Sequence, residues 1–391
     1  MGLVSAAVAI SQRRAARRPA GADGAAVRIT GLEAIPFAVP YRRPAGFASG
    51  VVTTADNVLV RVHTDAGLVG HAEAQPRPYT YGETQSSILL TVRERLEPLL
   101  LGISPLDTEV VAERCAQVTG NHVARGAVDL AVWDLAGQIL DLPCHTLLGG
   151  FATDVAAAHM VSFGEPAEMA EEAVAIHERL GVRAFKVKVG RTPDVDVAAT
   201  RAVREALPDA DLYVDANRGW SYEDALRAGD ALIEMGVRGI EEPISVDDRD
   251  GRRRLADRWG VPLIGDESCI SLAHVDRAID EGAVRTVSVK TARTGFTESR
   301  RILDLCLGRS IPVIVGSQYE GALGAMATIA FAAAFAATAG RPAEITNFLD
   351  LKDDLLAVPP DVRDGRVAVS AAPGLGVEVD ETKLTRYRLD A

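Results

Sequence analysis

The feature that most constrains the fold is a repeat that runs from residue 151 to residue 350. Short apolar segments with strand character alternate there with amphipathic segments of helical periodicity. Strands are expected at residues 156–163, 184–189, 212–215, 239–241, 262–266, 286–290, 312–315 and 344–347. Strand–helix units of this spacing favour a parallel sheet, and eight strands in roughly 200 residues favour a closed barrel over an open sheet. The lack of a GxGxxG or Walker-type loop weakens a nucleotide-binding alternative.

Five consecutive strands of this repeat end in a charged residue. These residues are Lys188, Asp215, Glu241, Asp266 and Lys290, at steps of 27, 26, 25 and 24 residues, one strand–helix unit each. The carboxyl ends of barrel strands meet at the mouth where barrel active sites lie. A single aspartate at such a place is as readily a helix N-cap. Five in succession, with three acidic residues between two lysines, indicate a common site instead.

The three acidic residues of this series predict a metal site. Carboxylates that converge repel one another unless a cation lies between them, and an all-oxygen ligand set suits Mg²⁺ or Mn²⁺. Histidine and cysteine are absent from these positions, so zinc is not expected. Lys188 and Lys290 would then lie on opposite sides of one cation. This is a layout for moving a proton at the carbon beside a metal-bound carboxylate.

Lys186 precedes Lys188 by two positions, so the two side chains share one face of their strand. Two neighbouring ammonium groups disfavour the charged form, which lowers a lysine pKa as a general base requires. The alternative is an edge strand with a solvated lysine pair. Asn217, Glu242 and Glu267 follow the strand ends closely, and we expect them to orient the metal ligands or lysines without binding metal.

The segments around the repeat predict a second domain. Residues 27–150 show an antiparallel meander followed by helices, which indicates a small α+β domain. Residues 351–391 leave the strand–helix pattern and are expected to pack on that domain. Residues 1–26 carry an apolar run followed by arginines, the reverse of a secretory signal, and are expected to form a mobile tail.

Charge and cysteine usage narrow the protein class. The net charge of 42 − 54 = −12 argues against a nucleic-acid or anionic-membrane binder. No stretch after the tail is long and apolar enough to span a bilayer. The four cysteines form no CxxC pair, which fits a reduced, cytoplasmic protein better than a disulfide framework.

As an ordered set, these motifs resemble the enolase superfamily, specifically its muconate lactonizing enzyme subgroup. The matching stretches are AVDLAVWD at 127–134, LLGG at 147–150, KVK at 186–188, VDAN at 214–217, EEP at 241–243, GDES at 265–268 and SVK at 288–290. The resemblance covers nearly the whole chain from residue 27 onward. It implies an α/β fold with a (β/α)7β barrel, a modified TIM barrel, under an N-terminal α+β capping domain that the C-terminal segment completes.

The resemblance also implies roles for individual residues. It implies one Mg²⁺ or Mn²⁺ on the three carboxylates, Lys188 and Lys290 as acid/base residues, and Lys186 as a residue that tunes Lys188. Glu320 stands where the family has an acidic residue after the seventh strand, which implies a catalytic role; a surface or helix-start glutamate is the alternative. The loops at 41–50 and 77–82 match the family's specificity lids. Substrate contacts are accordingly expected from Phe47, Arg77, Tyr79 and Tyr81. Relatives are commonly dimers or octamers, which implies a homo-oligomer.

Within the subgroup the chain looks most like muconate cycloisomerases. The stretches GFASG at 46–50, KTARTGF at 290–296 and NFLD at 347–350 are similar to a branch that cycloisomerises with anti stereochemistry. Many relatives have lysine at the position of Arg293 and glycine at that of Phe296. These departures leave the metal and lysine chemistry intact and bear on the substrate.

The predicted reaction is conversion of cis,cis-muconate to muconolactone, in aromatic (catechol) degradation. One carboxylate would bind the metal, the other would add across the double bond, and a lysine would protonate the metal-stabilised enolate at carbon. Anti addition favours Lys290 as the acid and syn addition favours Lys188. Dipeptide or N-acylamino-acid epimerisation and o-succinylbenzoate synthesis need the same groups and remain alternatives. So do a Schiff-base aldolase and a barrel retained for binding alone.

Overall fold

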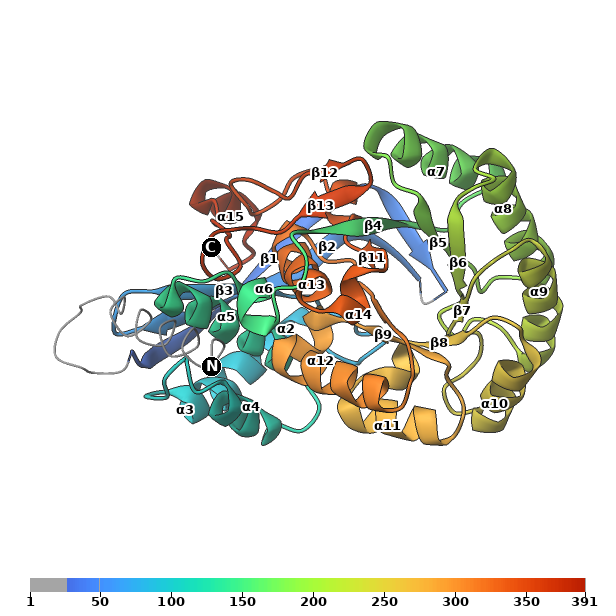
Figure 1. Ribbon diagram of the computed structural model, residues 1–391. Coiled ribbons are helices and arrows are strands. Elements are labelled where there is room, and N and C mark those ends of the chain that lie inside the picture. Colours follow the sequence, from blue (N-terminus) through green and yellow to red (C-terminus); the bar gives the residue numbers. More distant parts are fainter. Residues whose placement is uncertain (1–26, 49, 391) are drawn as a thin grey trace, which may run out of the picture.

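The computed structural model describes residues 27–48 and 50–390, so the predicted tail at 1–26 lies outside the described residues. Figure 1 shows two parts: a small sheet with helices, coloured blue to green, and a ring of strands enclosed by helices, coloured green to orange. Within the described residues, no helix is long and apolar enough to cross a membrane.

The first part begins with a three-stranded antiparallel sheet in the order β1-β2-β3. Its elements are β1 (Ile29–Phe47), β2 (Gly50–Thr64), β3 (Val69–Ala74), α2 (Gln85–Thr91), the π-helical turn η1 (Val92–Leu96), α3 (Glu97–Leu100), α4 (Thr108–Ala116), α5 (His122–Leu140) and α6 (Cys144–Leu148). This is the α+β cap expected from the sequence.

The segment 41–50, expected as a loop because of its prolines and glycines, is instead the far end of a long hairpin. Strands β1 and β2 pair up to Phe47 opposite Gly50, and an irregularity between Pro40 and Ala45 takes up the extra residues. A bulge of this kind lets a strand accommodate proline. The hairpin therefore reaches from the cap to the barrel mouth (Figure 1).

Helix α5 joins the cap to the barrel and is buried along most of its length. It packs on the cap sheet and on helix α12 (Thr291–Gly308) of the barrel. Gly126 permits the second contact, because a Cβ atom there would lie 2.7 Å from the backbone oxygen of Arg293. The buried residues of α5 thus reflect packing between two layers rather than on one side.

The second part is the predicted barrel. Its elements are β4 (Asp154–Val161), α7 (Pro166–Leu180), β5 (Ala184–Lys188), α8 (Pro193–Ala206), β6 (Asp211–Asp215), α9 (Tyr222–Glu234), β7 (Ile240–Glu241), α10 (Arg249–Arg258), β8 (Leu263–Gly265), the 3₁₀ turn η2 (Glu267–Cys269), α11 (Leu272–Asp280), β9 (Thr286–Val289), α12 (Thr291–Gly308), β10 (Val313–Val315), α13 (Ala322–Ala334), α14 (Ala336–Ala339), β11 (Ala343–Glu344) and the 3₁₀ turn η3 (Asn347–Asp350). Strands β4 to β10 pair in parallel in chain order, and β11 pairs in parallel with β4. This ring confirms the predicted (β/α)7β fold class.

The C-terminal segment contacts both parts of the molecule. It holds β12 (Val362–Arg363), β13 (Arg366–Ala368) and α15 (Glu381–Tyr387). As expected, its end packs on the cap, where the Leu389 amide donates to the Pro36 carbonyl at 2.9 Å. In addition, β13 pairs antiparallel with the start of β4, which the sequence did not indicate.

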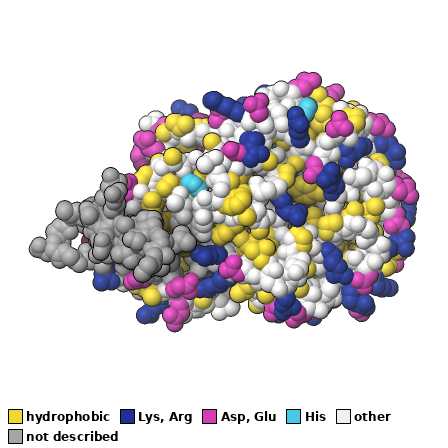
Figure 2. All heavy atoms as spheres, in the orientation of Figure 1, with side chains coloured by type: hydrophobic (Ala, Val, Ile, Leu, Met, Phe, Trp, Pro, Cys, Tyr) yellow, Lys and Arg dark blue, Asp and Glu magenta, His cyan; other side chains and the backbone are white. Residues whose placement is uncertain are grey.

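The face shown in Figure 2 carries basic and acidic side chains interspersed over the barrel helices. A nucleic-acid surface would gather its basic side chains in a patch or stripe. The described part of this face shows no such patch or stripe.

Candidate metal centre and active site

Strand register brings the predicted metal ligands to one level of the barrel. Lys188 stands opposite Asp215, and Asp215 opposite Glu241, in the pairing of β5, β6 and β7. Asp266 directly follows β8. Each of the three buried acidic residues offers one oxygen, and these oxygens lie within 4.8 Å of one another. This all-oxygen, buried triad fits a divalent cation such as Mg²⁺ or Mn²⁺.

Two lysines flank the triad from opposite directions. Lys188 Nζ donates to Asp215 Oδ2 at 2.7 Å and to Asn217 Oδ1 at 2.8 Å. Lys290 Nζ donates to Asp266 Oδ2 at 2.5 Å. Both side chains line the same cavity, so the arrangement can present an ammonium group to either side of a bound molecule.

Lys186 lies below the mouth among three carboxylates. Its Nζ is 3.0 Å from Glu241 Oε1, 3.2 Å from Asp215 Oδ2 and 2.8 Å from Glu344 Oε1. Burial would lower the pKa of Lys186, but these carboxylates outweigh burial and raise the pKa well above its usual range. The predicted influence of Lys186 on Lys188 stays a prediction, since the surrounding carboxylates compensate much of its charge.

Glu344 is a residue of the site that the sequence interpretation missed. It ends β11, accepts a hydrogen bond from the Tyr213 hydroxyl at 2.7 Å and lines the cavity. The available signal was the same charge at a strand end that marks the other strands. The predicted strand at 344–347 began at Glu344, whereas β11 ends there, so the pattern was not recognised.

Arg293 is the second residue whose role was missed. From the first turn of α12 its guanidinium donates to Asp266 Oδ1 at 2.8 Å and to the Tyr81 hydroxyl oxygen at 3.0 Å. Burial would raise the pKa of Asp266, but Lys290 and Arg293 outweigh burial and hold it below its usual range. Asp266 is therefore ionised and available as a ligand.

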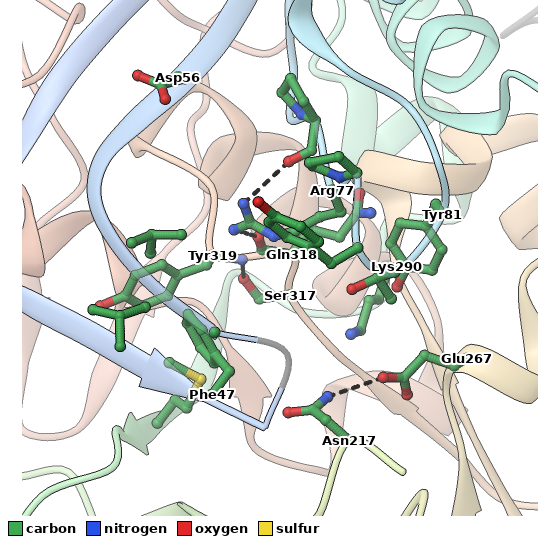
Figure 3. Close-up of a pocket in the computed structure, with 18 of the residues that line it drawn as sticks. Phe47, Asp56, Arg77, Tyr81, Asn217, Glu267, Lys290, Ser317, Gln318 and Tyr319 are labelled. Atoms are coloured by element: carbon green, nitrogen blue, oxygen red, sulfur yellow. Dashed lines mark hydrogen bonds between the residues drawn. The ribbon is translucent and has the colours of Figure 1, made fainter. Parts of the chain in front are cut away.

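The residues expected to orient the ligands divide into two groups. Asn217 Nδ2 donates to Glu267 Oε1 at 3.1 Å, and both residues line the cavity (Figure 3). Burial, together with Asp266 and Glu242, raises the pKa of Glu267 to about 8. Glu242 is paired with the buried Arg252 and accepts from the Asp266 amide at 2.6 Å. It therefore shapes the turn after β8.

The cavity has a volume of about 450 Å³ and lies between the barrel mouth and the cap. Phe47, Arg77, Tyr79 and Tyr81, the four lid residues expected to contact substrate, all line it. Figure 3 shows Phe47 at the tip of the hairpin, with Arg77 and Tyr81 on the opposite side of the opening. Of these four residues Tyr79 is the most exposed, with 77% of its surface accessible to solvent.

Glu320, unlike the predicted lysines and lid residues, does not line the cavity. Its carboxylate accepts from Ser317 Oγ at 2.6 Å, from the Gln318 amide at 2.7 Å and from Thr328 Oγ1 at 2.9 Å. These bonds fold the loop after β10 back on itself, because the side chain turns inward toward α13. These contacts assign Glu320 to holding this loop, and its expected catalytic role stays a prediction.

Comparison with known proteins agrees with this geometry. Two family models match: "Mandelate racemase / muconate lactonizing enzyme, N-terminal domain" over residues 31–149 and "Enolase C-terminal domain-like" over residues 168–383. A crystal structure of muconate lactonizing enzyme from Mycobacterium smegmatis, complexed with muconolactone, is 44% identical with a TM-score of 0.92, covering 93% of this chain and 100% of that chain.

Curated relatives of this chain have more than one activity. The hydrophobic dipeptide epimerase of Enterococcus faecalis is 31% identical over 70% of this chain and 77% of its own length. The chloromuconate cycloisomerase of Cupriavidus pinatubonensis is 29% identical over 89% of this chain and 95% of its own length. The relatives of this chain therefore include both an epimerase and a cycloisomerase.

Proposed function

This chain belongs to the mandelate racemase/muconate lactonizing enzyme family of the enolase superfamily, and from that premise we propose that it is a muconate cycloisomerase, converting cis,cis-muconate to muconolactone in catechol degradation. The observation that carries the proposal is the similarity over nearly the full chain to a muconate lactonizing enzyme with its product. That similarity exceeds the one to the dipeptide epimerase in both identity and coverage.

The triad supplies the electrostatic part of the reaction. When bound by Asp215, Glu241 and Asp266, a divalent cation would stabilise the negative charge that develops on one substrate carboxylate. Although burial opposes it, Lys188 holds the pKa of Asp215 below its usual range, and Lys290 with Arg293 does the same for Asp266, so these two ligands are ionised and fixed in place. Asn217 holds the Lys188 ammonium group toward the cavity through the 2.8 Å bond described above.

The lysines supply the proton. In the proposed reaction the second carboxylate of muconate forms a carbon–oxygen bond at one end of a double bond, and the other end receives a proton from a lysine, which solvent then reprotonates. Delivery from Lys290 gives anti addition, and delivery from Lys188 gives syn addition. Their positions on opposite sides of the triad make the product's stereochemistry a direct report of which lysine acts.

The test is to add cis,cis-muconate to the purified protein with Mn²⁺ and follow the diene absorbance. We expect loss of absorbance and, in D₂O, one stereospecific deuterium in muconolactone by NMR. Unchanged absorbance with metal bound would contradict the proposal.

Dipeptide epimerisation is the second candidate, favoured by the same opposed lysines and by the epimerase relative. It requires both lysines to act on one carbon. Exchange of the α-proton of L-Ala-L-Glu into D₂O, with epimerisation and no loss of muconate absorbance, would establish it in place of cycloisomerisation.

A further inference from the structure

Gln318, in the loop after β10, is buried yet lines the cavity. Gln318 is 4% exposed, and among the described residues neither the amide nitrogen nor the amide oxygen of its side chain has a hydrogen-bond partner. A buried amide without partners is unfavourable, because both of its polar groups have lost their hydrogen bonds to water. Polar groups that a protein leaves unpaired in the wall of a cavity are the groups that fix the orientation of a ligand.

Three polar side chains beside Gln318 are engaged with the protein. The guanidinium of Arg77 donates to the backbone oxygens of Pro76 and Gln318. The Tyr319 hydroxyl donates to Asp350 Oδ2 at 2.8 Å, and Ser317 Oγ donates to Glu320. Arg77, expected from the sequence to hold the substrate, thus ties the lid to the loop after β10. Figure 3 shows these groups close together on the side of the cavity opposite Asn217 and Glu267.

The backbone around Gln318 is fixed on both sides. Its own amide donates to Glu320 Oε2 at 2.7 Å, its carbonyl accepts from Arg77, and the next carbonyl accepts from Gln75. Tyr319 follows with a φ of 70°, a left-handed conformation that a tyrosine adopts only where the surroundings impose it. The loop therefore presents the Gln318 amide in one place, as a preorganised binding group requires.

We propose that the Gln318 side-chain amide binds the substrate carboxylate that is not on the metal, donating from Nε2 to one of its oxygens. This inference rests on the proposed function, because it takes the substrate to be a dicarboxylate. The chemistry favours a neutral donor here. The carboxylate loses its charge when it adds to the double bond, and a guanidinium would stabilise the charged reactant more than the transition state. Gln318 is thus a specificity residue for dicarboxylates.

The experiment compares Gln318→Met, which keeps the length of the side chain, with Gln318→Asn and with Gln117→Met, an exposed glutamine at the end of α4. Calorimetry measures the binding of adipate, a dicarboxylate, and of hexanoate, the monocarboxylate of the same chain length, to the Mn²⁺-loaded proteins. Thermal unfolding checks that each variant is folded. Wild type is expected to bind the dicarboxylate more tightly. Gln318→Met should weaken adipate binding roughly 10–100-fold and leave hexanoate unchanged. Gln117→Met should change neither.

The outcomes separate this inference from the proposed function. The inference is overturned if Gln318→Met still prefers adipate over hexanoate, or if it binds both ligands more weakly by the same factor. Loss of the preference in Arg77→Met but not in Gln318→Met assigns the carboxylate to Arg77 and also overturns it. A wild type that prefers adipate through Gln318 but does not consume muconate supports the binding role and overturns the proposed reaction. If Gln318→Met does not fold, a weakened adipate preference in Gln318→Asn supports the inference and an unchanged one overturns it.

Discussion

Buried carboxylates occur both in the cap and at the barrel mouth, and the two groups differ in their hydrogen-bond partners. In the cap, Asp129 Oδ2 accepts from the backbone amides of Phe296 at 2.7 Å and Thr297 at 3.0 Å. Asp134 accepts from the amides of His71 at 2.9 Å and Leu375 at 2.7 Å. These amides belong to segments far away in the chain, so each carboxylate joins two parts of the fold.

At the barrel mouth the partners are charged side chains. Glu241 accepts from Lys186 at 3.0 and 3.1 Å, and Asp266 from Lys290 and Arg293. Because a carboxylate oxygen has more than one acceptor site, an oxygen paired with one lysine can still coordinate a cation. This difference shows that burial of a carboxylate does not by itself indicate a catalytic or metal-binding role. Backbone partners indicate a structural role, and convergent carboxylates with side-chain cations indicate a metal site.

Removal of the metal is expected to give the largest effect. Chelation should lower muconate turnover by about 10³-fold or more, since metal stabilisation of developing charge contributes several kcal/mol to catalysis. Mg²⁺ or Mn²⁺ should restore it. Circular dichroism should stay unchanged, because the cap carboxylates do not depend on the cation. Full activity after exhaustive chelation would contradict the proposal that the carboxylates at the barrel mouth bind a catalytic metal whereas those of the cap are structural.

Replacing either flanking lysine is expected to give the next largest effect. Lys188→Met and Lys290→Met should each lower kcat by roughly 10²–10⁴-fold, because each removes an acid/base group or its charge. The exposed Lys352→Met serves as the matched control and should retain wild-type kcat. A lysine variant that retained wild-type kcat would assign its residue to ligand positioning instead of proton transfer.

Replacing a cap carboxylate should act on stability and leave the chemistry intact. Asp134→Ala leaves the His71 and Leu375 amides without partners and should lower the free energy of unfolding by roughly 2–5 kcal/mol. Urea unfolding measures this, and the exposed Asp209→Ala is the control. Turnover per folded molecule should match wild type. Lost turnover in a fully folded Asp134→Ala protein would contradict the division between the two regions.

The barrel and its metal triad could be predicted because their signal is repeated and local. Each strand end carries one charge, at intervals set by a single strand–helix unit, so a few residues around Asp215 or Glu241 suffice to place it. The bonds of Asp129 and Asp134 could not be predicted in the same way. Their motif was recognised, but their partners lie more than 160 residues away, as with Thr297, or in the C-terminal segment.

Two residues of the loop after β10 show why part of the site could not be predicted, because their roles depend on side-chain direction. Glu320 has the sequence position of a catalytic acid, but its carboxylate turns inward to hold the loop. Gln318 stands two residues earlier and faces the cavity, and its signal is the lack of a partner, which only the folded structure reveals. Strand ends fix direction through the pleat, whereas loop residues depend on contacts from other segments.

The pH dependence of stability offers the smallest and most specific test of the comparison. Burial raises the pKa of Asp129 from 3.8 to about 6, against the hydrogen bonds that lower it. Between these two values the folded protein binds more protons than the unfolded chain, so this group's contribution to stability is full below pH 4 and is lost as the pH rises through 6. Asp129→Asn, whose amide can still accept from both backbone amides and donate to Thr297, removes that loss. From pH 4 to pH 7 the variant should therefore gain about 2 kcal/mol in unfolding free energy relative to wild type, measured by urea unfolding. If the unfolding free energies of variant and wild type instead changed in parallel with pH, the backbone amides would fully offset the unfavourable burial of the Asp129 charge. Unfavourable burial of a carboxylate would then be confined to the barrel mouth.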